Sequence, residues 1–77
     1  MSKLKELRES TGLSQSQLAE KAELSKRTLQ EIEQGRRDIN GMKLLTLLKL
    51  CRALNCDLPD ILTDPETIKL LQEITRR

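Results

Sequence analysis

The sequence predicts an all-α fold, a compact domain of five to six helices, and three observations support this fold class. Leucine dominates the apolar residues, and only two prolines occur among 77 residues. Apolar residues recur at intervals of three and four, which places them on one face of a helix. Each such segment follows a serine, asparagine or aspartate, the residue types that cap helix N-termini.

The first helix is expected to begin after Ser2 and to end at Gly12. The Ser2 hydroxyl can accept a hydrogen bond from the first turn, and Leu4 and Leu7 then face inward. Gly12 can supply the left-handed residue that often follows the last turn of a helix.

Residues 13–35 predict two short amphipathic helices joined by a tight turn. Ser14 and Gln17 have the spacing of a capping box, Ser25 caps the second helix, and Gly35 ends it. The inward positions, including one in the turn, are Leu18, Ala19, Ala22, Leu24, Leu29 and Ile32. The start of the second helix is left polar, basic and turned outward, the arrangement that presents a helix to the DNA major groove.

Residues 36–39 are expected to form a loop anchored by Ile39, and Asn40 to cap the longest helix, over about residues 41–54. The expected main apolar stripe consists of Leu44, Leu47, Leu48, Cys51 and Leu54. The residues that widen it are Met42, Leu45 and Leu50. An apolar surface this wide predicts packing on more than one side.

Two acidic caps are expected in the last third of the chain. Asp57 and Asp60 can cap a one-turn helix that tolerates Pro59 in its first turn, and Asp64 precedes a last helix. The periodic residues of that last helix are Thr67, Leu70, Leu71 and Ile74. The order of the acidic residues does not fit a calcium-binding loop, so we predict caps and no metal site.

Composition excludes several classes of function. The sequence has no histidine, so the most frequent general base and the commonest metal ligand are missing. It has no aromatic residue, so the stacking surfaces used to bind single-stranded nucleic acids are missing as well. Cys51 and Cys56 are expected to be reduced apolar fillers. We predict no enzymatic activity, no cofactor and no small-molecule substrate.

Charge and hydropathy predict a protein of the cytoplasm whose basic part is either a phosphate-binding surface or only a solvated surface. Residues 1–54 hold eleven Lys and Arg against seven Asp and Glu, a net charge of +4. Residues 55–77 hold three against five, a net charge of −2, so the basic part contains the predicted helix pair. The longest leucine-rich run is too short to span a bilayer, and no signal peptide begins the chain.

The segment LSQSQLAEKAELSKRTLQEIEQG resembles the helix-turn-helix of the phage repressor/Cro-like (Xre-type) family of DNA-binding transcriptional regulators. Gln15 opens the first motif helix, Ala19 lies where the two helices cross, and IEQG matches the end of the recognition helix. The resemblance continues through RRDIN and LLKLCRALNCDLPDIL and covers about 60 of the 77 residues. It implies a lambda-repressor-like domain over residues 3–62, with the motif at 15–34 and residues 64–77 outside the pattern.

The resemblance implies a set of residues that contact DNA. The matching positions are Gln15, Ser25, Lys26, Arg27, Gln30, Glu31, Gln34, Arg36 and Arg37. Gln15 is expected to contact a phosphate at a helix N-terminus. Arg27 can bind guanine and Gln30 adenine through two hydrogen bonds each. Glu31 either faces the DNA or pairs with a basic neighbour such as Arg27.

The remaining implied DNA contacts lie at and beyond the end of the second motif helix. One residue in the turn before that helix differs from the family pattern. The resemblance implies that Gln34, Arg36 and Arg37 hold the DNA backbone beyond that helix. Glu23 stands where the family most often has a glycine in a left-handed turn. A left-handed conformation is unfavourable for a residue with a Cβ atom, so this position predicts local strain.

The resemblance implies sequence-specific binding of double-stranded DNA by a transcriptional regulator, a repressor at an operator. The alternative is a protein-interaction module or antitoxin-like partner with the same fold, docking through residues 42–54 and the last helix. One recognition helix reads few base pairs, so we expect a homodimer formed through Leu70, Leu71 and Ile74. Alternatively, this helix folds back onto Leu45 and Leu50 of its own chain.

Overall fold

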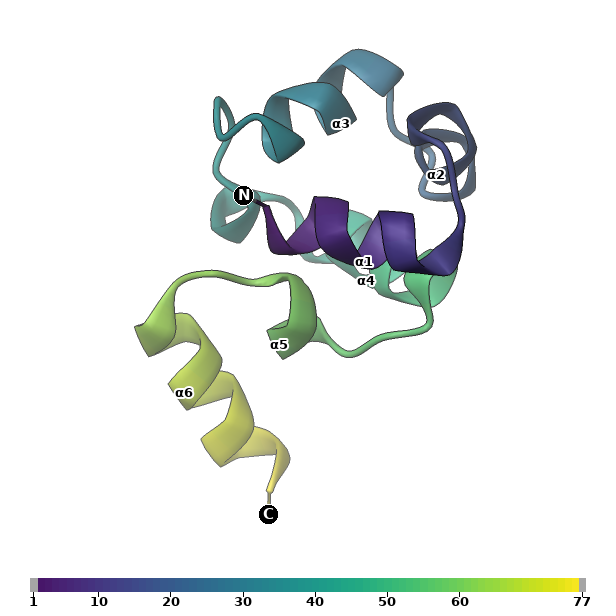
Figure 1. The fold of residues 1–77 in the computed structure, drawn as a ribbon. Helices are drawn as coiled ribbons and strands as arrows, with labels where there is room; N and C mark the ends of the chain where they lie inside the picture. Colours follow the sequence, from purple (N-terminus) through teal and green to yellow (C-terminus); the bar gives the residue numbers. More distant parts are fainter. Residues whose placement is uncertain (1, 77) are drawn as a thin grey trace.

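The computed structural model describes residues 2–76, and within this range the chain forms six α-helices, one 3₁₀-helical turn and no strand (Figure 1). In chain order the elements are α1 (Lys3–Thr11), α2 (Gln15–Lys21), α3 (Lys26–Glu33), η1 (Ile39–Gly41), α4 (Leu44–Leu54), α5 (Leu58–Ile61) and α6 (Pro65–Thr75). The predicted all-α fold class is confirmed. Arg77, the last residue of the predicted segment 64–77, lies outside the described residues.

The first three helices begin at the predicted serine caps. The hydroxyls of Ser2, Ser14 and Ser25 each accept a hydrogen bond from the backbone N–H three residues further on, at 3.3, 3.1 and 3.0 Å. The Gln17 side chain in turn accepts from the Ser14 N–H at 2.9 Å, which completes the capping box. The sequence thus determines where these helices start.

Glycines follow the ends of α1 and α3, as predicted. Gly12 and Gly35 have φ angles of +81° and +78°, the left-handed conformation that glycine adopts without steric cost. The Gly12 N–H donates to carbonyl groups of the last turn of α1, and the Gly35 N–H donates to the Ile32 carbonyl.

The core combines one fully buried side chain from each of the first five helices. These residues are Leu4, Leu18, Leu29, Leu50 and Ile61. In Figure 1, α1 and α4 cross the middle of the molecule, with α2 and α3 on one side of them and α5 on the other. The predicted anchor Ile39 is buried too, so η1 closes the core next to the end of α3.

The predicted start of the longest helix is wrong. Residues 39–41 form η1, and α4 begins only at Leu44, after the extended residues Met42 and Lys43. Asn40 therefore caps no helix of its own. Its side-chain oxygen accepts hydrogen bonds from the backbone N–H groups of Thr63 and Asp64, at 2.9 and 3.0 Å. The short-range capping pattern was overridden by a long-range contact.

The predicted apolar stripe of α4 is correct at three positions and wrong at two. The buried residues of α4 are Leu47, Leu50, Cys51 and Leu54. Leu44 and Leu48 are 61% and 47% exposed, because Leu50, rather than either of them, faces the body of the domain. Burial of the Cys51 thiol raises its pKa to about 12, in keeping with a small apolar filler.

The last helix packs on the rest of the chain through few residues. It contains no buried residue, contacts α5, and rests on the core through the partly buried Ile68 and Leu71. The alternative in which this helix folds back onto Leu45 and Leu50 is wrong for Leu45, which is 63% exposed, whereas Leu50 is fully buried in the core on which Ile68 and Leu71 rest. Figure 1 shows α6 running away from the body of the domain, and its Leu70 and Ile74 are 50% and 62% exposed.

The acidic residues of this region act at helix starts. The Asp60 carboxylate accepts a hydrogen bond from the Asp57 N–H, and the Asp64 carboxylate accepts from the Thr67 hydroxyl and N–H. The bonds from Thr67 lower the pKa of Asp64. In the described part of the chain, no helix is both long and apolar enough to cross a membrane.

Candidate nucleic-acid interface

The turn between α2 and α3 holds the two helices at a fixed angle. Leu24 is partly buried against the core at the inside of this turn. Glu23, the residue before it, has a φ angle of +56°, so the left-handed conformation implied by the resemblance is present at a residue with a side chain. Its carboxylate pairs with the Lys49 ammonium of α4 at 2.9 Å, and this hydrogen bond lowers the pKa of Glu23.

The exposed face of α3 begins with two basic residues. Successive residues of a helix are about 100° apart, so the face opposite the buried Leu29 and Ile32 is centred on Arg27 and Gln34. Lys26 and Arg27 are exposed in the first turn, and the Arg27 side chain keeps 89% of its accessible surface. A cationic side chain in this position reaches outward from a helix N-terminus, which itself attracts anions.

The residues predicted to contact DNA fall into two groups. One group lies along the start and outer face of α3, with the start of α2 beside it, and comprises Gln15, Ser25, Lys26, Arg27, Gln30, Glu31 and Gln34. Arg36 and Arg37 form the second group, in the exposed loop between α3 and η1. The first group therefore follows the length of α3, and the second lies beyond the C-terminal end of the same helix.

Glu31 connects the two groups. Its carboxylate lies 3.1 Å from the guanidinium of Arg37 and 3.9 Å from that of Arg27. Of the two expectations for Glu31, pairing with a basic neighbour is the one that this geometry shows. Since all three side chains are at least partly exposed, these pairs orient the arginines more than they stabilise the fold.

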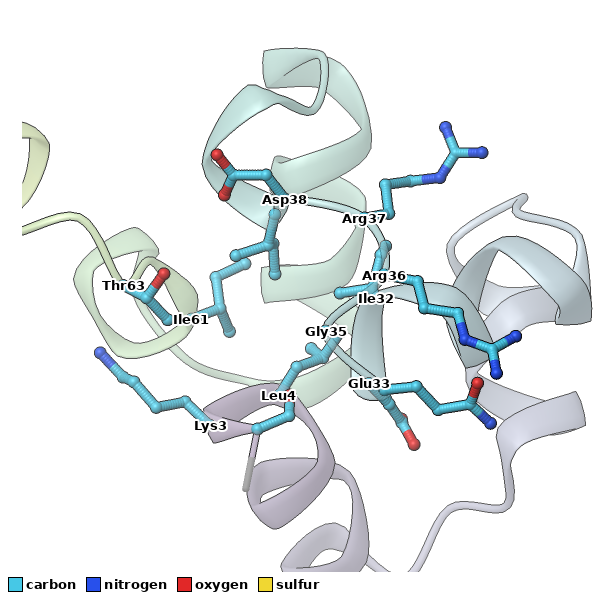
Figure 2. Close-up of a pocket in the computed structure, with 13 residues that line it drawn as sticks. Lys3, Leu4, Ile32, Glu33, Gly35, Arg36, Arg37, Asp38, Ile61 and Thr63 are labelled. Carbon is cyan, nitrogen blue, oxygen red and sulfur yellow. The ribbon is translucent and has the colours of Figure 1, made fainter.

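The C-terminal end of α3 borders a hollow of about 590 Å³ (Figure 2). Its walls come from the start of α1, the loop after α3, and the end of α5. The guanidinium groups of Arg36 and Arg37 lie on the side away from Lys3 and Thr63. Lys3 donates instead to the carbonyl oxygens of Pro59 and Leu62, at 2.9 and 2.7 Å, and so holds α1 to the end of α5.

A buried ion pair that the sequence did not predict lies beneath this surface. The Arg8 guanidinium donates to both carboxylate oxygens of Glu33, at 2.7 and 3.1 Å, and to the Leu13 carbonyl at 2.9 Å. The side chains of Arg8 and Glu33 are 10% and 2% exposed, and the hydrogen bond that Arg8 donates to Glu33 raises the pKa of Arg8. Arg8 lies one helical turn after Leu4, so a charge on the apolar face of a predicted helix was the available signal.

Two of the predicted contact residues are joined to this ion pair. The Gln15 side-chain nitrogen Nε2 donates to Glu33 at 3.0 Å, and its oxygen Oε1 accepts from Gln30 Nε2 at 3.3 Å. Gln15 and Gln30 are half-buried as a result. No buried side-chain nitrogen or oxygen among residues 2–76 lacks a hydrogen-bond partner.

Comparisons with known proteins agree with this geometry. The model of a helix-turn-helix domain family matches residues 2–61. A chain of the solved SinR protein–SinI protein complex superposes with a TM-score of 0.68 and 28% sequence identity, over 94% of this chain and 74% of that chain. No curated protein matches the sequence.

Proposed function

Because the chain belongs to the phage repressor/Cro-like (Xre-type) helix-turn-helix family of DNA-binding transcriptional regulators, we propose that it represses transcription by occupying an operator. The exposed basic start of α3 carries this proposal. Arg27 stands clear of the body of the protein, at a helix N-terminus and without a buried partner. In the major groove its guanidinium can donate two hydrogen bonds to guanine O6 and N7.

The surrounding residues are proposed to set the position of α3 on the duplex. Lys26 and the backbone at Ser25, where α3 starts, face the phosphates beside the groove. Arg36 and Arg37, with Gln34, face the backbone beyond the other end of the helix. Phosphate contacts of this kind fix register and orientation but carry no sequence information.

Salt dependence of binding to duplex DNA tests this proposal. Lys26, Arg36 and Arg37 would displace about three counterions per protomer, so log K should fall with log salt concentration at a slope of about −3 per protomer. Selection from a random-sequence duplex library then identifies the preferred site. Absence of binding at low salt, or enrichment of no common sequence, would contradict the proposal.

We further propose that two copies bind together, as a homodimer. Discrimination against a genome needs more base pairs than one α3 can read, and paired recognition helices lie about 34 Å apart, one turn of DNA. The exposed Leu70 and Ile74 of α6 support this helix as the interface. Sedimentation at tens of micromolar should give a dimer for the full chain and a monomer for a chain that ends at Thr63. A dimer that survives the truncation would move the interface to another surface.

A protein partner is the second candidate. The solved structure that this chain resembles is a complex of two different proteins, and α4 exposes Leu44, Leu45 and Leu48 on one face. An apolar surface of this kind suits a partner helix. A partner that binds here would do so with little dependence on salt, in contrast to duplex DNA.

A further inference from the structure

Two cysteines come together where α4 ends. The chain leaves this helix through Asn55, whose φ angle of +54° is left-handed. The Asn55 N–H donates to the Arg52 carbonyl at 3.4 Å, and the Cys56 N–H donates to the Cys51 carbonyl at 3.0 Å. These two bonds form a Schellman motif, in which the residue after the left-handed one commonly packs its side chain against the residue whose carbonyl it bonds. Both of these positions are cysteines, so the motif places two thiols side by side.

The same backbone hydrogen bond limits the separation of the two residues. With standard bond lengths, a distance of 3.0 Å from the Cys56 nitrogen to the Cys51 oxygen keeps the two Cα atoms within about 7 Å. Two cysteines can be joined without backbone movement only below a Cα separation of about 7 Å. The two thiols are also close enough to share a hydrogen bond, so their side chains point toward each other. Both thiols are free in the structure.

The two thiols differ in their access to solvent. Cys51 is 8% exposed, whereas Cys56 is half-buried, and both border a hollow of about 620 Å³ walled by α1, the end of α4 and the start of α5. Burial raises the pKa of the Cys51 thiol to about 12. Burial also raises the pKa of Cys56, but the hydrogen bond with Cys51 opposes this rise. Since the thiolate is the nucleophile, Cys56 is the thiol that reacts first.

We propose that Cys51 and Cys56 form a thiol-oxidation site, at which a low-molecular-weight disulfide converts the pair into a disulfide bond across the end of α4. The proposal goes beyond the proposed function and is independent of it. The pair lies in the last turn of α4 and the residue after Asn55, whereas the proposed DNA contacts lie on α3 and its neighbours.

The reaction takes place in two exchange steps. In the first, the Cys56 thiolate attacks one sulfur of the small disulfide, whose S–S bond breaks, and the departing thiolate takes up the proton that Cys56 lost. In the second, Cys51 gives up its proton and attacks the Cys56 sulfur, and the second small thiol leaves with that proton. The two cysteines lose two electrons and two protons, and the small disulfide becomes two thiols.

Tryptic digestion of the full chain after incubation with oxidised glutathione tests the proposal. Trypsin cuts after Lys49, Arg52 and Lys69, which separates the cysteines into peptides 50–52 and 53–69. The intact oxidised protein should be lighter by about 2 Da, the mass of two hydrogen atoms, and its digest should contain these two peptides joined together. Glutathione adducts without the joined peptides, or disulfide-linked pairs of chains, would overturn the proposal.

Matched single variants test the order of the two steps. Cys51→Ala should stop at one glutathione adduct on Cys56, because no second thiol is present to displace it. Cys56→Ala should form its adduct at least about tenfold more slowly, because the remaining thiol is buried and has a higher pKa. Equal rates in the two variants would overturn the assignment of Cys56 as the first thiol to react. The digest of the wild-type protein requires neither variant to fold.

The equilibrium with glutathione tests whether the fold brings the thiols together. The equilibrium constant for forming the bond should be at least about tenfold larger in native protein than in protein unfolded in urea. Because a bond favoured by the folded state stabilises that state in return, the melting temperature of the oxidised protein should rise by about 5 °C. Cys51→Ala carried through the same treatment is the control. An equal constant in native and unfolded protein, or a fall in melting temperature on oxidation, would overturn the proposal.

Discussion

The helix-turn-helix pair α2–α3 and the C-terminal helix α6 are attached to the body of the protein in different ways. Helix α3 buries Leu29 completely, and its Glu33 forms an ion pair with Arg8 that joins the two helices to α1. The C-terminal helix has no buried residue and rests on the partly buried Ile68 and Leu71. The two helices α2 and α3 are therefore part of the core, whereas α6 contributes none of the five fully buried side chains.

The largest expected effect comes from breaking the buried ion pair. Glu33→Ala leaves the Arg8 guanidinium buried without its partner and should lower the free energy of unfolding by about 3–5 kcal/mol. Helix circular dichroism during urea or thermal unfolding measures this, since the sequence has no Trp, Tyr or Phe for fluorescence. The exposed Glu20→Ala is the control. A loss below about 1 kcal/mol would contradict the claim that this pair fastens α3 to α1.

The outer surface of the same helix should affect DNA binding instead of stability. Arg27→Ala should weaken binding to the preferred site by about 1–3 kcal/mol and relax discrimination at one base position. Arg36→Ala should weaken binding to all sequences by similar factors, because a phosphate contact carries no sequence information. Titrations of the preferred duplex and a scrambled duplex measure both. If neither variant changed specific binding, the assignment of this face to DNA would be wrong.

Weakening the attachment of α6 should lower the free energy of unfolding less than breaking the buried ion pair does, and its effect should be confined to α6. Asn40→Ala removes the hydrogen bonds to the Thr63 and Asp64 N–H groups and should lower the free energy of unfolding by about 1–2 kcal/mol. Amide exchange should accelerate in α6 more than in α3, with the exposed Gln72→Ala as the control. Equal acceleration in both helices would show that α6 unfolds only together with the core.

The smallest expected effect is at the turn of the helix pair. Glu23→Gly relieves the left-handed conformation but adds freedom to the unfolded chain and removes the pair with Lys49. The melting temperature at neutral pH should stay the same or rise by a few degrees, about 5 °C at most. A clear fall would show that the contact with Lys49 outweighs the backbone strain.

The Glu23 variant also has a defined pH dependence. The pair with Lys49 lowers the pKa of Glu23, so its stabilising effect is present above the unfolded-state pKa and is lost as the pH falls through the folded-state pKa. The advantage of Glu23→Gly over wild type should therefore increase below about pH 4. Thermal melts of both proteins across the acid range measure the difference, and Lys49→Met should remove it.

The parts of the fold that depend on neighbouring residues were predictable from the sequence. The serine caps and the glycines after α1 and α3 act within one helical turn, so their spacing was sufficient. Asn40 has the same local pattern as a cap but bonds to residues 23 and 24 positions away, which no local pattern reveals. The exposure of Leu44 and Leu48 depends on how α4 turns against α1 and α5, and periodicity alone does not fix that rotation.

The candidate site was predictable to a similar extent. Exposed residues such as Arg27 follow from the position of the motif, because the outer face of a helix is set by its buried face. The hydrogen bonds of Gln15 and Gln30 depend on Glu33 being buried against Arg8 of another helix. That pairing requires the relative placement of α1, α2 and α3, which only the structure supplies.

Because the Arg8–Glu33 pair is buried, the stability of the fold and the binding of DNA are expected to depend differently on ionic strength. Mobile ions screen charges that lie in solvent. They screen the Arg8–Glu33 pair far less, because its side chains are only 10% and 2% exposed. The proposed contacts with phosphates, in contrast, weaken steeply as salt rises. Over a range of salt concentrations the protein is therefore expected to leave DNA while its recognition helix stays in place, so that it can rebind without refolding.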